Sequence, residues 1–263
     1  GKQADAQKYG ELFEKIRAAF QKAFVKPDGI VGSGSQTSYV LALHMNLLSP
    51  EQRSLAVQKL VDDIVAHDYH LTTGFLGTPY ILLELSDSGH SDTAYKLLLQ
   101  TTFPSWGYMI EHGATTMWER WNGDQMLADP GMNSFNHYAY GAVAEWLYRY
   151  AAGIDTSNDD VGFHRIVLHP QFSRELGEMN ATYDSVYGPI HSEWKVSGGT
   201  TTWIVGIPAN TTALLQFPVG PQTKITENGK GIGADVTIKL VKTERSTSIY
   251  EIGSGSYSFT IGQ

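Results

Sequence analysis

The stretch His67-Asp-Tyr-His-Leu-Thr-Thr-Gly-Phe-Leu-Gly77, which runs directly into Thr78-Pro-Tyr-Ile-Leu-Leu-Glu-Leu85, decides the fold of the first part of the chain. A polar and aromatic loop with glycines leads here into a helix that carries little charge and ends near Gly89. A helix with so few charged residues is expected to be buried on most sides. The same order occurs once before, where a glycine-rich loop at residues 31–35 leads into a weakly charged helix at 36–46.

More polar helices alternate with these two. Residues 9–25 repeat apolar side chains at three-and-four spacing, and Ser49 followed by Pro50 opens a third helix to about Ala66. A fifth helix at 91–100 and a sixth at 136–151 complete the series. The apolar side chains expected to face inward are Leu12, Phe13, Ile16, Ala19, Phe20, Ala23 and Phe24 in the first helix and Leu55, Val57, Leu60, Val61 and Ile64 in the third.

The helices therefore form pairs of one polar and one buried member. Antiparallel pairing places the three polar loops, at 31–35, 67–77 and 103–123, at one end of the bundle. The last loop is the longest, and a long loop in a compact domain is usually functional. A complete (α/α)6 toroid has twelve helices in six pairs, whereas about six are expected here. We predict a partial (α/α)6 toroid.

The pattern changes to short β-type runs after residues 153–160. Asn228-Gly229 is typical of a tight hairpin turn, and Pro208, Pro218 and Pro221 stand where strands are expected to end. We predict an antiparallel β-sandwich at 156–263, preceded by the helical part at 1–155. The runs expected to be strands are 165–168, 191–196, 201–207, 212–217, 237–240 and 257–260.

Composition excludes several classes of protein. A net charge of −8 and the lack of any basic run argue against nucleic-acid binding. Apolar runs are far shorter than the roughly 20 residues that span a bilayer, so no membrane partner is expected. Without cysteine there is no disulfide or thiolate chemistry, and the compartment stays open. The chain starts Gly-Lys-Gln rather than with Met, which indicates a processed chain or an expressed fragment.

A carboxylate in an unusual place marks the candidate site. In Gly113-Ala-Thr-Thr-Met-Trp-Glu-Arg-Trp-Asn-Gly123, Glu119 lies beside Arg120 and between Trp118 and Trp121. Aromatic faces and polar groups together suit a sugar ring, and a carboxylate can take a proton from water. The alternative is that both tryptophans belong to the core and that Glu119 is ion-paired to Arg120. The residues alone favour neither reading.

Other groups around this stretch extend the same chemistry. Trp106 precedes it, and Asn136 and His137 stand at the start of the expected sixth helix; the further carboxylates are Glu111, Asp124 and Asp129. His67, His70, His112 and His137 lack the close spacing of metal ligands, so no metal is expected. No serine nucleophile elbow and no phosphate-binding loop are present, so no cofactor is expected.

Four runs in the helical part carry a resemblance to a known family. They are 71–80 (LTTGFLGTPY), 104–108 (PSWGY), 113–121 (GATTMWERW) and 132–141 (MNSFNHYAYG), and 187–194 and 207–213 extend the likeness into the β part. Together they resemble the C-terminal half of bacterial α-L-rhamnosidases of glycoside hydrolase family 78. The resemblance implies an (α/α)6 catalytic barrel, a C-terminal β-sandwich and metal-free, inverting hydrolysis of terminal α-L-rhamnose.

The resemblance also implies residue roles. Glu119 matches the general base that activates water, and His137 matches a histidine that contacts the sugar. Trp106, Trp118 and Trp121 match pocket positions, and Arg120 and Asn136 are expected beside them. The family's acidic motif, which holds the general acid, has no counterpart here: Asp62 and Asp63 lie on an outer helix, and Asp159 and Asp160 lie in the linker.

We therefore expect the C-terminal portion of an α-L-rhamnosidase, inactive alone, with a rhamnose-containing glycoside or polysaccharide as its ligand. Two alternatives stay open: a carbohydrate-binding or scaffold fragment without turnover, and another α/α-toroid glycosidase or lyase. An open half-barrel would also expose apolar helix faces, which predicts self-association. A bacterial chain of this kind could be periplasmic, extracellular or cytoplasmic.

Overall fold

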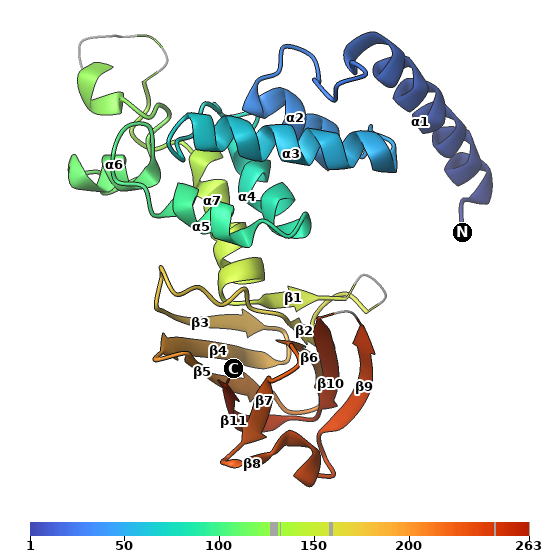
Figure 1. Ribbon diagram of the computed structural model, residues 1–263, viewed down its shortest axis with the longest axis vertical. Coiled ribbons are helices and arrows are strands. Elements are labelled where there is room, and N and C mark those ends of the chain that lie inside the picture. The colour runs from blue at the N-terminus through green and yellow to red at the C-terminus, as the bar shows by residue number, and fades with distance from the viewer. Residues whose placement is uncertain (127–130, 132, 158–159, 245, 263) are drawn as a thin grey trace. The chain divides into compact units, whose positions relative to one another are not determined.

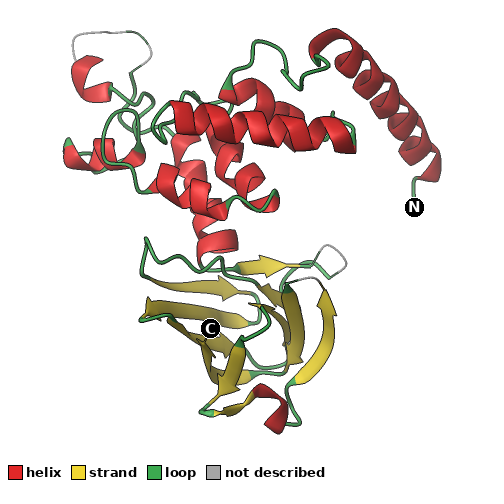
Figure 2. Cartoon of the chain, viewed as in Figure 1, coloured by secondary structure: helices red, strands yellow, loops and turns green. Residues whose placement is uncertain are grey.

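The computed structural model describes residues 1–126, 131, 133–157, 160–244 and 246–262. The chain divides into two compact units, a helical unit at Gly1–Val143 and a β unit at Ala144–Gln263, each described here by itself (Figures 1 and 2). No helix in the described ranges is long and apolar enough to cross a membrane.

The helical unit follows the expected order of elements. Serine caps begin three of its helices: Ser35 Oγ accepts the Ser38 N–H, Ser49 forms a capping box with Gln52, and Ser105 caps the sixth. Its elements are α1 (Gln3–Phe24), α2 (Gln36–His44), α3 (Pro50–Ala66), α4 (Thr78–Asp87), α5 (Ser91–Leu98), α6 (Trp106–Glu111) and the 3₁₀ turns η1 (Gly123–Met126) and η2 (Ala139–Ala142).

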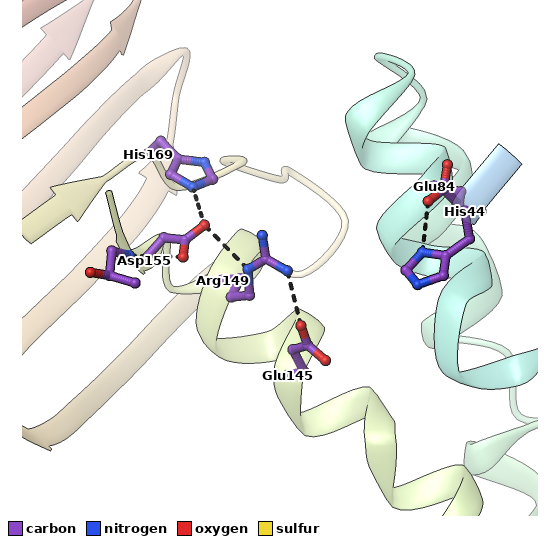
Figure 3. A network of polar contacts seen from close by, with 7 residues as sticks. His44, Glu84, Glu145, Arg149, Asp155 and His169 are labelled. Carbon is purple, nitrogen blue, oxygen red and sulfur yellow. Dashed lines mark hydrogen bonds and ion pairs between the residues drawn. The ribbon is translucent and has the colours of Figure 1, made fainter. Parts of the chain in front are cut away.

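The alternation of polar and buried helices is confirmed. Helices α2 and α4 hold more buried residues than any other helix of the unit, and α4 packs against α2, α5 and η2. Of the two charged residues of α4, Glu84 is buried and Asp87 is exposed. Glu84 pairs with His44 Nδ1 at 3.0 Å (Figure 3). It also accepts a hydrogen bond from Arg53 Nη2 at 3.1 Å. A buried carboxylate is tolerated because both partners are charged or polar and lie within hydrogen-bond distance.

Helix α1 departs from the expectation. Its apolar stripe was expected to face inward, yet no residue of α1 is buried, and Leu12, Ile16 and Phe24 are 47%, 51% and 54% exposed. Leu55 of α3 is likewise exposed, whereas Leu60 and Ile64 are buried as expected. Periodicity identifies the apolar face of a helix correctly, but it does not reveal whether the described chain supplies anything to cover that face.

Two further elements differ from the prediction. The expected long loop at 103–123 contains α6, which begins where Ser105 Oγ accepts the Tyr108 N–H. The expected single helix at 136–151 is instead η2, the short α7 (Val143–Trp146) and the π-helical η3 (Leu147–Ala151). Side chains compete for the backbone at its start, because Ser134 Oγ accepts the Asn136 N–H and His137 Nδ1 accepts the Ala139 N–H.

The β unit is a two-sheet sandwich. One sheet has the order β1-β2-β6-β10-β9, and the other has the order β3-β4-β5-β11-β7-β8. Among the described strands all pairs are antiparallel except β2 with β6, which is parallel, so the predicted antiparallel sandwich is confirmed with one parallel pair. The strands are β1 (Ile154–Thr156), β2 (Arg165–Leu168), β3 (Glu178–Ser185), β4 (Gly188–Ser197), β5 (Thr200–Ile207), β6 (Thr212–Pro218), β7 (Lys224–Glu227), β8 (Lys230–Gly231), β9 (Lys239–Glu244), β10 (Thr247–Ile252) and β11 (Gly255–Gly262).

The sandwich core is built around aromatic side chains from both sheets. Trp203, Phe217 and Phe259 pack edge to face or tilted, with ring centroids 5.1 to 6.0 Å apart. The indole N–H groups are also satisfied. Trp194 Nε1 donates to Ala151 O at 2.7 Å, and Trp203 Nε1 donates to Ser192 Oγ at 3.1 Å. The end of η3 thus belongs to the sandwich core, and the β unit begins within the expected sixth helix.

The predicted hairpin turn is present, but several strands were missed. Asn228 and Gly229 both have positive φ, 46° and 78°, and join β7 to β8. Strand β3 was missed because most of its side chains are exposed, so it lacks a strong alternation of apolar and polar residues. Strand β1 lies inside the expected linker. The remaining missed strands are β7, β8 and β10.

A charged network joins η3 to the first strands of the β unit. Arg149 pairs with Glu145 at 2.9 Å and with Asp155 at 3.2 Å, and His169 Nε2 lies 3.4 Å from the same Asp155 oxygen (Figure 3). Burial acts to raise the pKa of Asp155, but the hydrogen bonds of His169 and the Thr156 N–H, together with the charge of Arg149, lower it overall.

We expect Asp155→Asn to lower the free energy of unfolding of the β unit by about 1–2 kcal/mol at pH 7. Because the pKa of Asp155 is lowered by folding, its stabilisation is complete above the unfolded pKa of about 3.9 and is lost as pH falls through the folded pKa. The difference between wild type and variant should therefore shrink on acidification. Urea unfolding at neutral and acidic pH measures this difference in stability. Hydrogen exchange of the Ile166 and Leu168 amides shows whether the change reaches β2.

Glu178→Gln is the matched control. Glu178 pairs with Lys195 at 2.6 Å, but both side chains are mostly exposed, so little change is expected at any pH. An equal loss of stability in the two variants would show that the Asp155 network contributes no more than a surface ion pair.

Candidate active site

The stretch that holds Glu119 is strapped to a second segment of the chain. The Glu119 N–H donates to Ser134 O at 2.8 Å, and the His137 N–H donates to Met117 O at 2.8 Å. The Thr116 hydroxyl also donates to Phe135 O. Residues 116–119 and 134–137 therefore run side by side. The helix expected from residue 136 is not formed in this segment.

The Glu119 carboxylate is fixed by the same strap. The Ser134 N–H donates to Glu119 Oε2 at 2.8 Å, so backbone and side chain of Glu119 both bond to one residue. The side chain is half-buried. Two bonds to the same backbone unit restrict the rotamers of the carboxylate, which is the orientation that a base acting on a water molecule needs.

Three tryptophans surround this strap, and all are buried. Trp106, Trp118 and Trp121 are 6%, 5% and 8% exposed. Trp121 stacks on Tyr140 at 3.9 Å between ring centroids, and Trp106 meets Trp121 edge to face at 5.3 Å. Trp106 Nε1 donates to Tyr140 O at 3.0 Å. Within this chain the tryptophans form an aromatic block that supports the Glu119 stretch from within.

Trp118 packs on the other side of the stretch. Its ring meets Phe135 edge to face at 5.6 Å, and a Cβ added at Gly123 would lie 3.0 Å from the indole. Gly123, the closing glycine of the stretch, therefore allows the backbone to approach the Trp118 ring.

The charges of Glu119 and Arg120 act on a common neighbour. Burial raises the pKa of Tyr140, the positive charge of Arg120 opposes this, and the negative charge of Glu119 adds to it. Both charged groups thus lie within electrostatic range of Tyr140, whose ring stacks on Trp121.

His137 and Asn136 follow the strap directly. His137 is half-buried, stacks on Tyr138 with ring centroids 5.1 Å apart, and its Nδ1 accepts the Ala139 N–H at 3.2 Å. A neutral histidine that accepts at Nδ1 carries its proton on Nε2, which leaves that N–H as a donor. Asn136 has an exposed side chain.

Gln36 is a functional candidate that the sequence reasoning missed. It is fully buried, its Nε2 donates to His70 O at 3.1 Å, and its Oε1 accepts the Thr72 N–H at 2.9 Å. The next carbonyl, Thr73 O, accepts Trp121 Nε1 at 2.9 Å. These bonds join three loops at one end of the helical unit, as predicted. The one sequence signal for Gln36 was its position, as an uncharged amide in the first turn of a weakly charged helix.

The other expected polar groups have local roles. Asp124 accepts the Tyr108 hydroxyl at 3.0 Å, Glu111 is exposed, and Asp129 lies outside the described residues. His70 bonds Thr102 through Nε2 at 2.7 Å, and His112 Nδ1 lies 2.8 Å from Tyr108 O. Across the described ranges, no group of three or more histidine and acidic side chains could hold a metal ion.

The acidic pairs outside the site are also placed. Asp62 on α3 is exposed and accepts Gln58 Nε2 at 2.8 Å, and Asp63 lies 3.3 Å from His67. Asp160 lies 3.4 Å from His164, and Asp159 is outside the described residues.

Comparison with known families decides the relationship of the chain. Residues 1–151 match the model of the bacterial alpha-L-rhamnosidase 6 hairpin glycosidase domain, and residues 153–231 match that of the bacterial alpha-L-rhamnosidase C-terminal domain. The chain belongs to the bacterial α-L-rhamnosidase family. The resemblance inferred from its motifs is confirmed, and so is the fold of a partial toroid followed by a β-sandwich.

Individual rhamnosidases match along nearly the whole chain. An α-L-rhamnosidase from Streptomyces avermitilis is 43% identical over 98% of this chain, and one from Formosa agariphila is 36% identical over 98%. The structure of the Streptomyces avermitilis enzyme complexed with L-rhamnose gives a TM-score of 0.86 over 97% of this chain, and that of the Dictyoglumus thermophilum enzyme, 34% identical, gives 0.89 over 100%. This chain covers 24–29% of these relatives.

We expect Gln36→Met to lower the free energy of unfolding of the helical unit by about 1–3 kcal/mol, because Met keeps the length of the side chain but leaves two backbone groups unpaired. Chemical denaturation measures the loss. Exchange of the Thr72 amide should accelerate, and the change should extend to the Trp121 indole N–H.

Gln58→Met on the exposed face of α3 is the matched substitution, and it should change stability by no more than about 0.5 kcal/mol. If the two variants are equally stable, or if the Trp121 indole exchanges at the wild-type rate in Gln36→Met, Gln36 does not position the loops.

Proposed function

We propose that this chain supplies the general base and part of the sugar pocket of an α-L-rhamnosidase that hydrolyses terminal α-L-rhamnosyl linkages with inversion. The observation that carries the proposal is the strapped Glu119 carboxylate, which Ser134 orients at 2.8 Å within a block of tryptophans. Family membership supports it, since relatives that match 98% of this chain are α-L-rhamnosidases.

The role of Glu119 follows from what inversion requires. One carboxylate takes a proton from a water molecule as that water attacks the anomeric carbon, and a second carboxyl group protonates the departing oxygen on the other face. Glu119 is suited to the first task because a hydrogen-bonded, half-buried carboxylate keeps one orientation toward the water.

The general acid is proposed to come from the part of the family's length that this chain does not span. Inverting enzymes hold their two carboxyl groups about 6.5–9.5 Å apart, with room for a water molecule. The family's acidic motif has no match in this sequence. We therefore expect the 263-residue chain to bind sugar weakly and to show no turnover by itself.

The pocket is proposed to bind the rhamnose ring by polar groups carried on an aromatic base. His137 offers its Nε2–H to a hydroxyl group; Asn136 lies in the same segment, and Arg120 directly follows Glu119. Trp106, Trp118 and Trp121 are so buried that their main part is to hold the Glu119 stretch in place. The Streptomyces avermitilis relative was crystallised with L-rhamnose, which fits this ligand class.

We expect Glu119→Gln to lower kcat on an aryl α-L-rhamnoside by about 100- to 10,000-fold, the usual contribution of a general base. The measurement uses a protein in which this chain is joined to the remainder of the family's length. The amide keeps the shape of the side chain and can still accept the Ser134 N–H, so KM should change little. Proton NMR of the product formed early in the reaction of the unmutated protein should show the inverted anomer.

Glu111→Gln is the control, because Glu111 is an exposed carboxylate of α6. It should retain activity within about twofold. Retained activity in Glu119→Gln would exclude Glu119 as the base. If the 263-residue chain alone turns over substrate and needs Glu119 for it, the general acid does not come from outside these residues. If the protein binds rhamnose and Glu119→Gln leaves the activity of the longer protein unchanged, a binding or scaffold role is favoured.

We also propose that the 263-residue chain self-associates through α1. An apolar stripe on this helix is exposed, with Tyr9 at 62%, Leu12 at 47%, Ile16 at 51% and Phe24 at 54%. The same helix carries acidic and basic residues, including Glu14 and Lys15, so antiparallel pairing of two copies can bring opposite charges together. Burying the stripe would remove its apolar surface from water.

We expect light scattering to show a dimer or larger species whose fraction grows with concentration, and Ile16→Glu to shift the mass toward the monomer. Val186→Glu is the matched substitution, since Val186 is 89% exposed in the turn between β3 and β4, away from α1 in sequence and unit. A monomeric mass for the wild-type chain at high concentration would exclude self-association.

A further inference from the structure

The β unit contains a cleft that the proposed function does not use. It has a volume of about 680 Å³ and is lined by residues of β4, β5, β6 and β11 and of the loops beside them. A second hollow of about 530 Å³ adjoins it and shares residues 221–223. Ligand sites for small molecules usually measure about 300–1,000 Å³, so each hollow is large enough for sugar rings.

The floor of the cleft is apolar and rigid. Phe172 meets Trp194 and Trp203 edge to face, each at 5.7 Å between ring centroids, and so stands at the margin of the sandwich core. Val196, Val219 and Ile261 complete this surface. Apolar side chains held by the core form a platform for the C–H face of a sugar ring.

The rim of the cleft is positively charged. Arg174 lines the cleft and Lys224 lines the adjoining hollow, and the residues that the structure describes around both include no carboxylate. In the described part of the chain neither cation forms an ion pair. The whole chain carries a net charge of −8, so one such cation beside each of two adjoining hollows differs in sign from the chain as a whole. Such a rim favours an anionic ligand.

The segments that carry these groups are ordered by their own hydrogen bonds. The Val219 N–H donates to Ser246 O at 2.7 Å, and the Gly220 N–H donates to Thr223 Oγ1 at 2.8 Å. On the opposite wall the Gly177 N–H donates to Ser173 O at 3.0 Å, closing the turn that carries Arg174. Ordered walls reduce the entropy that a ligand would lose on binding.

We propose that this cleft binds an acidic oligosaccharide. A sugar ring lies with its C–H face on Phe172 and Val219, its hydroxyl groups reach Thr201 and Gln222, and its carboxylate pairs with Arg174 or, across residues 221–223, with Lys224. Arginine is suited to this because its planar fork accepts a carboxylate through two hydrogen bonds. The site lies entirely in the β unit and does not depend on the role of Glu119.

The test measures binding of matched disaccharides to the 263-residue chain by calorimetry, with NMR of backbone amides to locate the site. Glucuronosyl-β-1,4-glucose and digalacturonic acid are the acidic probes, and cellobiose is the neutral counterpart of the first. We expect both acidic probes to shift the amides of Thr201, Gly220 and Thr223, and cellobiose to bind at least about tenfold more weakly, the usual worth of a charge-assisted hydrogen bond.

Variants separate the cleft from general attraction of anions. Arg174→Gln should weaken binding of glucuronosyl-glucose about tenfold, whereas Lys239→Gln, which removes one exposed cation from β9, should leave it within about twofold. Equal effects of the two variants would exclude the cleft. Binding of inorganic sulfate as tight as that of the acidic disaccharides would exclude recognition of a sugar.

Absence of binding by both acidic disaccharides at about 10 mM would also overturn the proposal, since such affinity is weaker than that of a functional subsite. Glu119→Gln tests whether this cleft is independent of the candidate active site. It should abolish turnover in the longer protein and leave disaccharide binding here unchanged, so failure of either proposal is recognised independently of the other.

Discussion

The buried amide of Gln36 is the interaction on which the candidate site depends. Backbone groups in a loop cannot be buried unless they are paired, because each unpaired group costs about 1–3 kcal/mol. Gln36 pairs two of them, His70 O and the Thr72 N–H, and so fixes this part of loop 67–77 against the start of α2. The adjacent Thr73 O accepts Trp121 Nε1, and Trp121 stacks on Tyr140, on which the charges of Glu119 and Arg120 act.

The two interpretations of the WERW motif apply to different residues: the core interpretation holds for the tryptophans, and the catalytic role of Glu119 stays a prediction. The tryptophans are core residues, with exposed fractions of 5–8% for Trp118 and Trp121. Glu119, however, is oriented by the Ser134 N–H, which is a backbone group and not a cation. The orientation of this carboxylate therefore comes from the backbone of the facing segment and not from the neighbouring Arg120.

Much of the fold could be predicted from the sequence, and the failures have physical causes. Helix α4 was clear because its apolar run begins at a proline and follows a glycine loop, and β2 was predicted at its observed bounds. The start of helix six was wrong: helical structure begins only at Ala139, and before it Ser134 Oγ and His137 Nδ1 accept backbone N–H groups in local turns. Gln36 was missed because its partners are more than thirty residues away in sequence, and a lone glutamine carries no periodic signal.

The geometry of the proposed base, Glu119, is determined inside this chain. Every bond named here that orients Glu119 comes from residues between Gln36 and Tyr140, all within the helical unit. A base that is ordered in this way does not require the general acid for its own position, so the two carboxyl groups can be contributed by separate segments of a barrel. What the second segment must provide is the spacing, because a water molecule has to fit between Glu119 and the sugar. The proposed division of the catalytic pair is therefore compatible with inversion: the position of Glu119 depends on packing within one unit, and only its distance from the proposed acid would depend on closing the barrel.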